Sequence, residues 1–410
     1  MDVLVERVAG LDVHRDTIVS CIRVPRPTGR GRASETREFA STAKGLERLG
    51  EWLAECGVTL VAMEATGVYW KPLFGAFEGV YELVLANAAH MKNVPGRKTD
   101  VGDAAWIAQL AEHGLLRSSF VPPRDIRQLR SMTRHRAGLM NERTRVIQRL
   151  EKALQDAGIK LTSVASTVLT KSGRSMLEAL AAGERDPNTL AEMARGRLRS
   201  KIPALKEAMV GEFDHHHATL VREGLAHVDF LDGAVERVSH AITVLTAPHA
   251  AAIALLQTIP GVGPRLAEVI LAEIGDDMSR FPTAGHLASW AGMCPGNNES
   301  AGRRGYGKTR PGSRWLRQAL VEAAQASART DSTYLAVRHA RIRTRRGSLR
   351  AAIATGHAIL VASWHILRDG VPFKELGVDF YSRRSPEVET RRLVRRLEAL
   401  GHNVTIAPAA

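Results

Sequence analysis

Cysteine is scarce in this sequence, whose 410 residues include only Cys21, Cys56 and Cys294. These three residues lie far apart, and no two of them form a C-x-x-C pair. An odd number of cysteines at such spacing supports neither a disulfide framework nor a structural zinc site. We therefore expect reduced thiols in or near a hydrophobic core.

Long apolar runs are missing as well. No stretch of about 18 consecutive apolar residues occurs, the length that a membrane-spanning helix needs. Asp2 and Glu6 stand near the N-terminus, where a signal peptide has a basic region followed by an apolar one. These absences argue against a membrane anchor and against secretion, and they predict a protein kept in the cytoplasm.

Acidic residues are outnumbered. The 43 Asp and Glu residues stand against 57 Lys and Arg residues, a formal net charge of +14, and the isoelectric point is near 10.2. A polyanion is the natural ligand of such a chain, and nucleic acid fits better than a membrane surface. The length predicts two or three domains.

Residues 1–115 show the pattern of a mixed α/β domain. Three β-rich segments joined by turns come first, and helices and strands then alternate. The expected strands cover 6–13, 17–24, 35–41, 58–63 and 80–86, and the expected helices cover 44–56, 68–77 and 100–113. This order is that of the ribonuclease H-like fold, so we predict an α/β domain here and an all-α remainder.

Four acidic residues in this domain form a candidate metal site. Asp12 closes one apolar run and Glu64 closes another, while Asp100 and Asp103 are three residues apart on one face of an expected helix. Carboxylates at strand ends and on a helical face can converge on an oxygen-ligated divalent metal, as phosphoryl transfer requires. Singly each acid is most simply a solvated surface carboxylate; as a set they favour the metal site.

Residues 124–250 are expected to be a helical region. Its long first helix, from Asp125 to Gly158, carries an arginine on nearly every turn, including Arg127, Arg134 and Arg145. Such a row can follow a phosphate backbone. The alternative is a solvated face, although only Glu142 and Glu151 are interleaved as glutamates. Further helices are expected at 173–183, 189–197, 203–225 and 229–246.

One histidine run in this region is not expected to bind metal. His215, His216 and His217 fall in an expected helix. Consecutive helical residues point about 100° apart, so the three side chains cannot form one chelating face.

Residues 251–370 form the expected third domain. The segment Ile259–Pro264 is typical of a helix-hairpin-helix, in which Gly261 and Gly263 permit a tight turn and the next helix presents amides to a DNA phosphate. A turn used only for packing is the alternative. Helices at 264–274, 283–291 and 312–328 and an arginine-rich segment follow, and 371–410 is an appended tail.

A serine in this third domain stands among cations. Ser300 precedes Arg303, Arg304 and Lys308 in a Gly/Arg-rich loop. A hydroxyl in such surroundings can attack a phosphate, because the cations balance the charge that develops.

Several motifs occur in a shared order and resemble the insertion sequence 110 family of transposases over roughly residues 6–366. They are Gly10-Leu11-Asp12-Val13-His14, Met63-Glu64-Ala65-Thr66-Gly67, the segment 97–104, the turn 259–264, Phe281-Pro282 with the segment 291–295, and Ser300 ahead of Gly312-Ser313-Arg314-Trp315-Leu316-Arg317. The resemblance implies a Holliday-junction-resolvase-like (RuvC-like) domain, a coiled-coil region for oligomerisation and nucleic-acid binding, and a C-terminal transposase domain.

The same resemblance implies a mechanism and partners. Asp12, Glu64, Asp100 and Asp103 would be ligands of Mg²⁺, or of Mn²⁺, and Ser300 would be the nucleophile of a covalent protein–DNA intermediate. The partners would be donor and target DNA, a structured non-coding guide RNA, and further copies of the chain in a dimer or tetramer whose active sites are shared between subunits. The setting would be the nucleoid of a bacterial cytoplasm.

The serine motif departs from the family pattern. Ala301 stands between Ser300 and Gly302, where the family usually has glycine directly after the serine. Ser289, in an apolar helix, and Ser313, which reads better as a helix N-cap, stay open as alternative nucleophiles. Two rival functions also stay open: a metal-dependent junction endonuclease that uses water, and a non-catalytic nucleic-acid scaffold.

Overall fold

The computed structural model describes residues 2–26, 31–65, 67–86, 102–294, 299–300, 302–304, 309, 311–384 and 386–407, with the backbone alone at 299–300, 303–304 and 384. The chain divides into two compact units, Met1–Arg124 and Asp125–Ala410. Each unit is described by itself.

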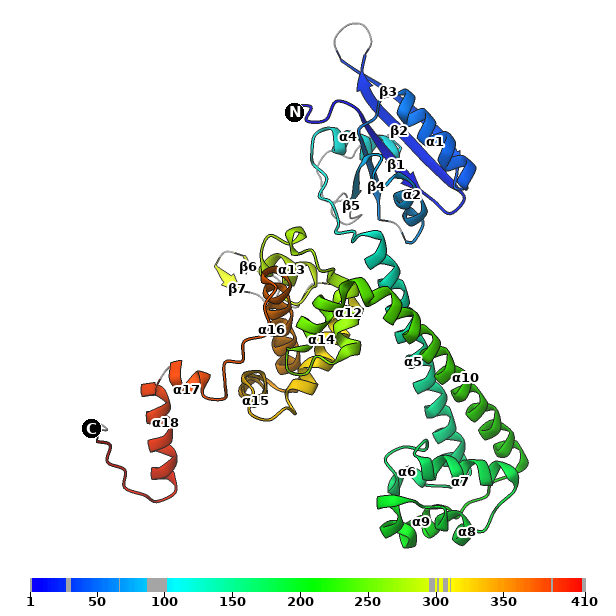
Figure 1. The fold of residues 1–410 in the computed structure, drawn as a ribbon, viewed down its shortest axis with the longest axis vertical. Helices are drawn as coiled ribbons and strands as arrows, with labels where there is room; N and C mark the ends of the chain where they lie inside the picture. Colours follow the sequence, from blue (N-terminus) through cyan, green and yellow to red (C-terminus); the bar gives the residue numbers. More distant parts are fainter. Residues whose placement is uncertain are drawn as a thin grey trace. The chain divides into compact units, whose positions relative to one another are not determined.

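The first unit contains a five-stranded sheet in the order β3-β2-β1-β4-β5 (Figure 1). β1 pairs antiparallel with β2 and parallel with β4, which in turn pairs parallel with β5. The strands are β1 (Val8–Val13), β2 (Thr17–Pro25), β3 (Arg32–Ala40), β4 (Leu60–Glu64) and β5 (Glu82–Ala86). The prediction of a mixed α/β N-terminal domain is confirmed, with strand positions close to those expected.

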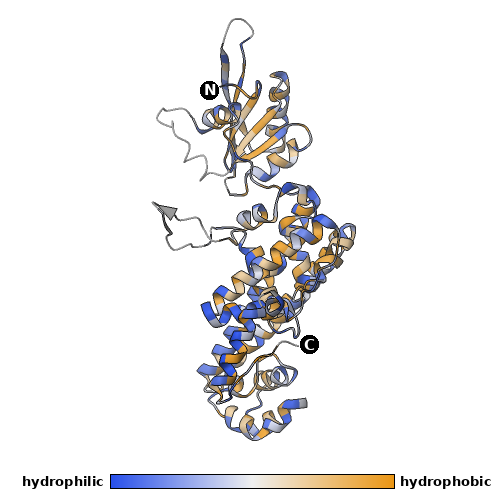
Figure 2. Cartoon of the chain, turned by 90° about the vertical axis from the view of Figure 1, so that its left-hand side faces the viewer, coloured by the Kyte–Doolittle hydropathy of each residue, from blue (hydrophilic) through white to orange (hydrophobic). Residues whose placement is uncertain are grey.

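Helices cover both faces of this sheet. α1 (Ala43–Glu55) and α2 (Trp70–Phe77) pack on the face that Leu11 and Met63 share. α4 (Asp103–Glu112) packs on the opposite face, against Val8 and Ala62. Alternate strand residues point to opposite faces of the sheet. Because helices cover both faces, both sets of side chains on β1 and β4 are apolar. Figure 2 shows the hydrophobic residues along these strands.

Gly10 fixes how closely α4 approaches the sheet. A Cβ atom at Gly10 would lie 2.2 Å from the Ala108 nitrogen and 2.3 Å from the Ala104 oxygen, both of α4. At the other end of α4, the buried Glu112 pairs with Arg23 of β2 and Arg32 of β3. The glycine and the ion pairs hold α4 against the sheet.

The second unit begins with two long helices, α5 (Arg124–Asp156) and α10 (His215–Thr246), which run side by side in Figure 1. Their shared core includes Leu150 and Val221. A Cβ at Gly224 would lie 2.4 Å from Leu150. The shorter helices between them are α6 (Leu161–Val164), α7 (Lys171–Ala182), α8 (Pro187–Glu192), η1 (Gly196–Lys201) and α9 (Ile202–Ala208).

Three helix boundaries in this region differ from the prediction. The expected helix 203–225 is broken after α9, and α10 continues through the break expected near residue 226. Gly211 contributes to the break. It packs so closely against Ala157 that a Cβ atom at this position would lie 2.2 Å from the Ala157 oxygen. Asp214 then starts α10 with a capping box to His217. The helix expected at 189–197 ends at Glu192.

The rest of the second unit is a helical bundle around α16 (Ser348–Asp369). Its other elements are η2 (Ala247–His249), α11 (Ala250–Gln257), α12 (Pro264–Ile274), η3 (Met278–Arg280), α13 (Ala284–Trp290), α14 (Arg314–Ser327) and α15 (Tyr334–Arg346). A short hairpin, β6 (Glu299–Ser300) and β7 (Arg303–Arg304), stands between α13 and α14. α17 (Phe380–Arg384) and α18 (Pro386–Ala399) follow. The expected mostly helical C-terminal part is confirmed.

Two expectations from composition can be compared with this fold. All three cysteines are free, and Cys21 is buried, as predicted. The helical segment His215–Gln257 is long enough, and apolar enough on average, to cross a membrane by length and composition, although polar residues interrupt its apolar ones. Core helices of soluble proteins pass the same test, so this finding is weak support for a membrane span.

Candidate active site and nucleic-acid surfaces

Asp12 and Glu64 lie at the carboxyl ends of adjacent parallel strands. Leu11 of β1 is paired with Met63 of β4, so Asp12 and Glu64 are the next residues along the two strands. Neighbouring strands are about 4.8 Å apart. Alternation places both carboxylates on the face covered by α4, opposite the face of Leu11 and Met63.

Asp103 is brought to the same edge by the direction of α4. It is the first residue of α4 and directly precedes Ala104, which packs on Gly10, two residues before Asp12. The far end of α4 lies near the chain before β1, since the Leu4 nitrogen donates to the Glu112 oxygen at 2.9 Å. α4 therefore runs antiparallel to β1 and starts at its carboxyl end. The helix expected at 100–113 begins at Asp103, after its N-cap Gly102, so it does not supply the predicted helical face for both Asp100 and Asp103. Asp100 lies outside the described residues.

Asp12 has a partner that the sequence analysis did not identify. His14 Nε2 is 3.0 Å from Asp12 Oδ2, with the imidazole mostly exposed and the carboxylate partly buried. Residues two apart in an extended segment point to the same face, so the sequence spacing of Asp12 and His14 could have predicted this contact. The imidazole can hold the orientation of this carboxylate.

The three described acids fit a hard divalent cation. They offer carboxylate oxygens, the donors that Mg²⁺ and Mn²⁺ prefer. Asp12 and Glu64 are half-buried and Asp103 is exposed, so a substrate oxygen can reach a metal held between them.

Ser300 lies on the β6–β7 hairpin. Its backbone pairs with that of Arg303, and Glu299 pairs with Arg304. Gly302 has φ +75°, a conformation that glycine adopts without strain. The hairpin keeps Ser300 and the two arginines in one short turn, whereas Lys308 lies outside the described residues.

The alternative serines differ in how they are used. Ser313 is the N-cap of α14, as predicted: its Oγ accepts from the Leu316 nitrogen at 3.3 Å and donates to Glu273 Oε2 at 2.8 Å. Because this hydroxyl already serves two internal bonds, Ser313 is a poor nucleophile. Ser289 lies on α13, and its side chain is exposed.

Several arginines of α5 form ion pairs within the second unit, and of these only Arg136 is buried. Arg134 makes two hydrogen bonds to the buried Glu273. Arg136 is buried against Glu268, and Arg143 pairs with Asp232. Arg134 was predicted to bind nucleic acid. In the structure its guanidinium is already bonded to Glu273. Arg145 is exposed and contacts Glu142 only at 3.9 Å, and Arg127 is half-buried.

The predicted helix-hairpin-helix turn has two different glycines. Gly261, with φ +88°, packs against α14, where a Cβ would lie 2.4 Å from the Ala323 oxygen and 2.5 Å from the Ser327 nitrogen. Packing alone explains that glycine. Gly263 is the exposed N-cap of α12, and a Cβ there would have no neighbour within 4 Å, so packing does not explain this glycine.

A second cationic surface lies at the corner between α15 and α16. Arg343, Arg345 and Arg346 are exposed and make no ion pair among the described residues. No acidic residue occurs in the sequence from 332 to 368. By contrast, Arg341 stacks on Tyr381, with its guanidinium 4.4 Å from the ring. We name Arg343, Arg345 and Arg346 the basic corner; the sequence analysis noted its arginines without assigning them a role.

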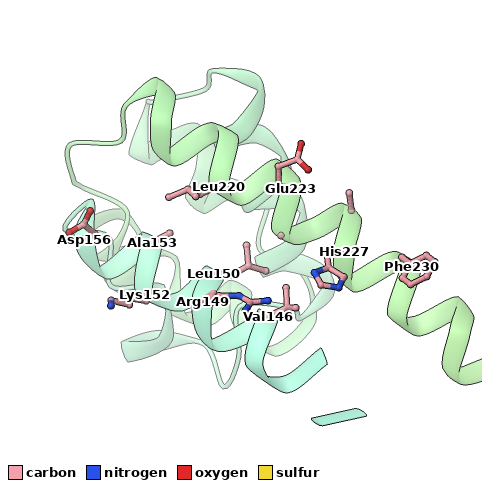
Figure 3. A pocket seen from close by; sticks show the side chains of 12 residues that line it. Val146, Arg149, Leu150, Lys152, Ala153, Asp156, Leu220, Glu223, His227 and Phe230 are labelled. Carbon is pink, nitrogen blue, oxygen red and sulfur yellow. The ribbon is translucent and has the colours of Figure 1, made fainter. Parts of the chain in front are cut away.

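An apolar groove runs between α5 and α10. Val146 and Leu150 of α5 and Leu220 and Phe230 of α10 line a cavity of about 830 Å³. Figure 3 shows these side chains on the two helices. Leu220 is 56% exposed and Phe230 is 63% exposed. Large apolar side chains exposed on a charged helix pair are typical of an association surface.

Asp156, His216 and His217 form a cluster whose ligand atoms lie within 4.8 Å of one another. The Asp214 nitrogen donates to His217 Nδ1 at 3.1 Å, so the neutral ring carries its proton on Nε2, which faces Asp156 Oδ2 at 3.3 Å. The prediction that this run is not a metal site considered the three histidines alone, whereas the fold brings His216 and His217 together with Asp156 in an arrangement that could hold a metal ion.

Comparison with known proteins gives family matches in two separate regions of the chain. A DEDD-type transposase family model matches residues 9–159. A second model, described as transposase of the IS116/IS110/IS902 family, matches residues 253–339. The 43.6 kDa protein of insertion element IS110 from Streptomyces coelicolor is 30% identical over 323 residues, which cover 71% of this chain and 74% of the relative. The 44.8 kDa protein of IS116 from Streptomyces clavuligerus is 29% identical over 60% of this chain and 68% of its own length.

Proposed function

Because the chain belongs to the IS110 family of transposases, which act on DNA, we propose that it excises and inserts DNA by strand exchange through a phosphoserine intermediate at Ser300. The observation that carries the proposal is the strand register that places Asp12 beside Glu64, with Asp103 above the same edge. The strand order is the one expected of a RuvC-like domain, and it supports that assignment for residues 1–115.

Asp12, Glu64 and Asp103, together with Asp100, would hold Mg²⁺ or Mn²⁺. The metal would polarise the phosphate oxygens and stabilise the charge that develops on them. His14 would keep the Asp12 carboxylate turned toward the site. Asp12 and Glu64 stand at the carboxyl ends of β1 and β4 and are only partly buried, so both are placed to take such roles.

In the proposed reaction, Ser300 Oγ attacks the phosphorus of a DNA phosphodiester. A bond between Oγ and phosphorus forms as a phosphorus–oxygen bond to the sugar breaks; the serine hydroxyl gives up its proton to solvent, and the sugar oxygen takes up a proton and leaves as a hydroxyl. Attack by a sugar hydroxyl of another strand reverses these events and joins the new strands, so no outside energy source is needed. Arg303, Arg304 and Lys308 would balance the phosphate charge.

We further propose the partners that the family resemblance implies. A structured guide RNA would supply the sequence reading, which suits a chain rich in arginines that bind backbones rather than bases. Residues 124–250 would make homo-oligomer contacts, and the apolar groove with Leu220 and Phe230 supports this role. The acidic site of one subunit would then work with Ser300 of another. Gly263, Arg127 and Arg145 would add nucleic-acid contacts.

A covalent adduct separates this proposal from the endonuclease that uses water. Denaturing gels of the reaction with labelled DNA should show protein joined to a DNA end, and peptide mapping should place the link on Ser300. Ser300→Ala should lose the adduct and keep DNA binding, whereas the control Ser289→Ala should retain both. A wild-type reaction that cleaves DNA without any adduct supports the water-using nuclease, and an adduct mapped to Ser289 or Ser313 moves the nucleophile.

A further inference from the structure

Glu273 connects Ser313, at the start of α14, to α5. It is the second-last residue of α12 and is only 1% exposed. Its Oε1 accepts from Arg134 Nε at 2.7 Å, and its Oε2 accepts from an Arg134 terminal nitrogen at 2.8 Å and from Ser313 Oγ at 2.8 Å. A buried carboxylate needs such partners, because an unpaired buried charge is strongly destabilising.

Arg130 holds the end of α12 in place. Its guanidinium donates to the Ala272 oxygen at 2.9 Å and to the Glu273 oxygen at 2.7 Å. These carbonyls belong to the last turn of the helix and have no partner within it. Glu273 is therefore fixed by its backbone as well as by its side chain, and its carboxylate presents a fixed acceptor to Ser313.

The two ends of the segment that carries Ser300 are held together near this point. A Cβ on Gly312 would lie 2.2 Å from the Ala291 oxygen and 2.7 Å from the Gly292 nitrogen, so the two backbones are in direct contact. Arg317 donates from its guanidinium to the Gly292 oxygen at 2.6 Å. The segment that carries Ser300 therefore begins at Gly292 and ends at Gly312, next to Ser313. We call the contact between these two ends the base of the segment.

We propose that Glu273 and Arg317 are positioning residues for the nucleophile, acting through Ser313 and Gly292 to fix the base of the Ser300 segment. This inference rests on the proposed function of Ser300. A reacting hydroxyl misplaced by about 1 Å can lose about 100-fold in rate. The Ser313 hydroxyl accepts from the Leu316 nitrogen and donates to Glu273, so it ties the start of α14 to the end of α12.

The test separates the rate of attack from folding and from binding. The full-length protein would be bound to DNA and guide RNA, and adduct formation on Ser300 would be followed in a single turnover. We expect Ser313→Ala and Glu273→Gln to slow the adduct by about 10- to 100-fold at unchanged DNA affinity. Ser313→Thr keeps both hydroxyl bonds and should restore the rate. Arg317→Lys should slow the adduct as well, because one amine cannot replace the guanidinium geometry.

Thr333→Ala is the matched control. Thr333 caps α15 in the same way, accepting from the Ala336 nitrogen at 3.2 Å, and contacts neither Glu273 nor Ser313. It should lower the melting temperature about as much as Ser313→Ala and leave the adduct rate unchanged. An adduct at the wild-type rate in both Ser313→Ala and Glu273→Gln overturns the inference alone. So does a slow Ser313→Ala that Ser313→Thr fails to rescue. Absence of an adduct in the wild-type protein overturns the proposed function and this inference together.

Discussion

Arg134 of α5 and Glu273 of α12 form a two-point ion pair, with nitrogen–oxygen distances of 2.7 and 2.8 Å. The paired arrangement matches the planar guanidinium to the carboxylate. The pair joins the long basic helix to the bundle that carries Ser300, so the Arg134 guanidinium, although 37% exposed, is already engaged by a buried carboxylate.

Arg134→Gln should destabilise the second unit without changing electrostatic binding to nucleic acid. Glu273 would lose its bidentate partner and keep Ser313, so we expect a loss of about 1–3 kcal/mol in the free energy of unfolding. Chemical denaturation measures the loss, and DNA titrations at several salt concentrations measure the slope. A flatter salt slope with unchanged stability would return Arg134 to the nucleic-acid surface.

The basic corner should show the opposite behaviour. Replacing Arg343, Arg345 and Arg346 with Gln should leave the melting temperature unchanged and weaken DNA binding, with the salt slope shrinking by roughly 0.9 for each phosphate that is no longer neutralised. Arg391, Arg395 and Arg396 of α18 provide a control triple, since they are exposed but lie among glutamates. If both triples change the slope equally, the effect reflects net charge alone.

The acid set should be needed for activity and not for folding. Asp12→Asn, Glu64→Gln, Asp100→Asn and Asp103→Asn should each abolish recombination and keep the melting temperature, because each removes an expected metal ligand rather than a core contact. Asp16→Asn, an exposed acid just after β1, is the control and should recombine normally. Wild-type recombination in any two of the four variants would break the shared site. Calcium should replace magnesium poorly, given its longer bonds and looser geometry.

Acidification should weaken the second unit through two histidines. Burial lowers the pKa of His339 on α15 and of His357 on α16 below the ordinary value of 6.5. Below that pH the unfolded chain binds more protons than the folded one, so the stability that these groups contribute is present above 6.5 and lost as pH falls through their folded pKa. The melting temperature should drop from pH 7 toward pH 5, and His339→Gln with His357→Gln should flatten the dependence. His402→Gln, at an exposed site, should not.

The arrangement of the first unit could be predicted because its signals are local. Apolar runs such as 58–63 encode strands, and the turn residues between them encode the order of the elements. Asp12 and Glu64 follow from the same pattern, since the ends of parallel strands meet at one edge. The motifs around these acids and Ser300 were also enough to indicate the family, and the comparisons confirm it.

The partners of charged side chains were decided by tertiary structure. An arginine on a helix surface has the same local sequence whether it meets a phosphate or a carboxylate from residues far along the chain. Arg134 meets Glu273, 139 residues away, while Arg343 meets no acid among the described residues. Helix periodicity also could not place the break before α10, which depends on Gly211 packing against Ala157. Residue types and their spacing thus determined the elements and the candidate chemistry, whereas contacts distant in sequence decided which charges remain available, because pairing depends on where the fold brings the opposite charge.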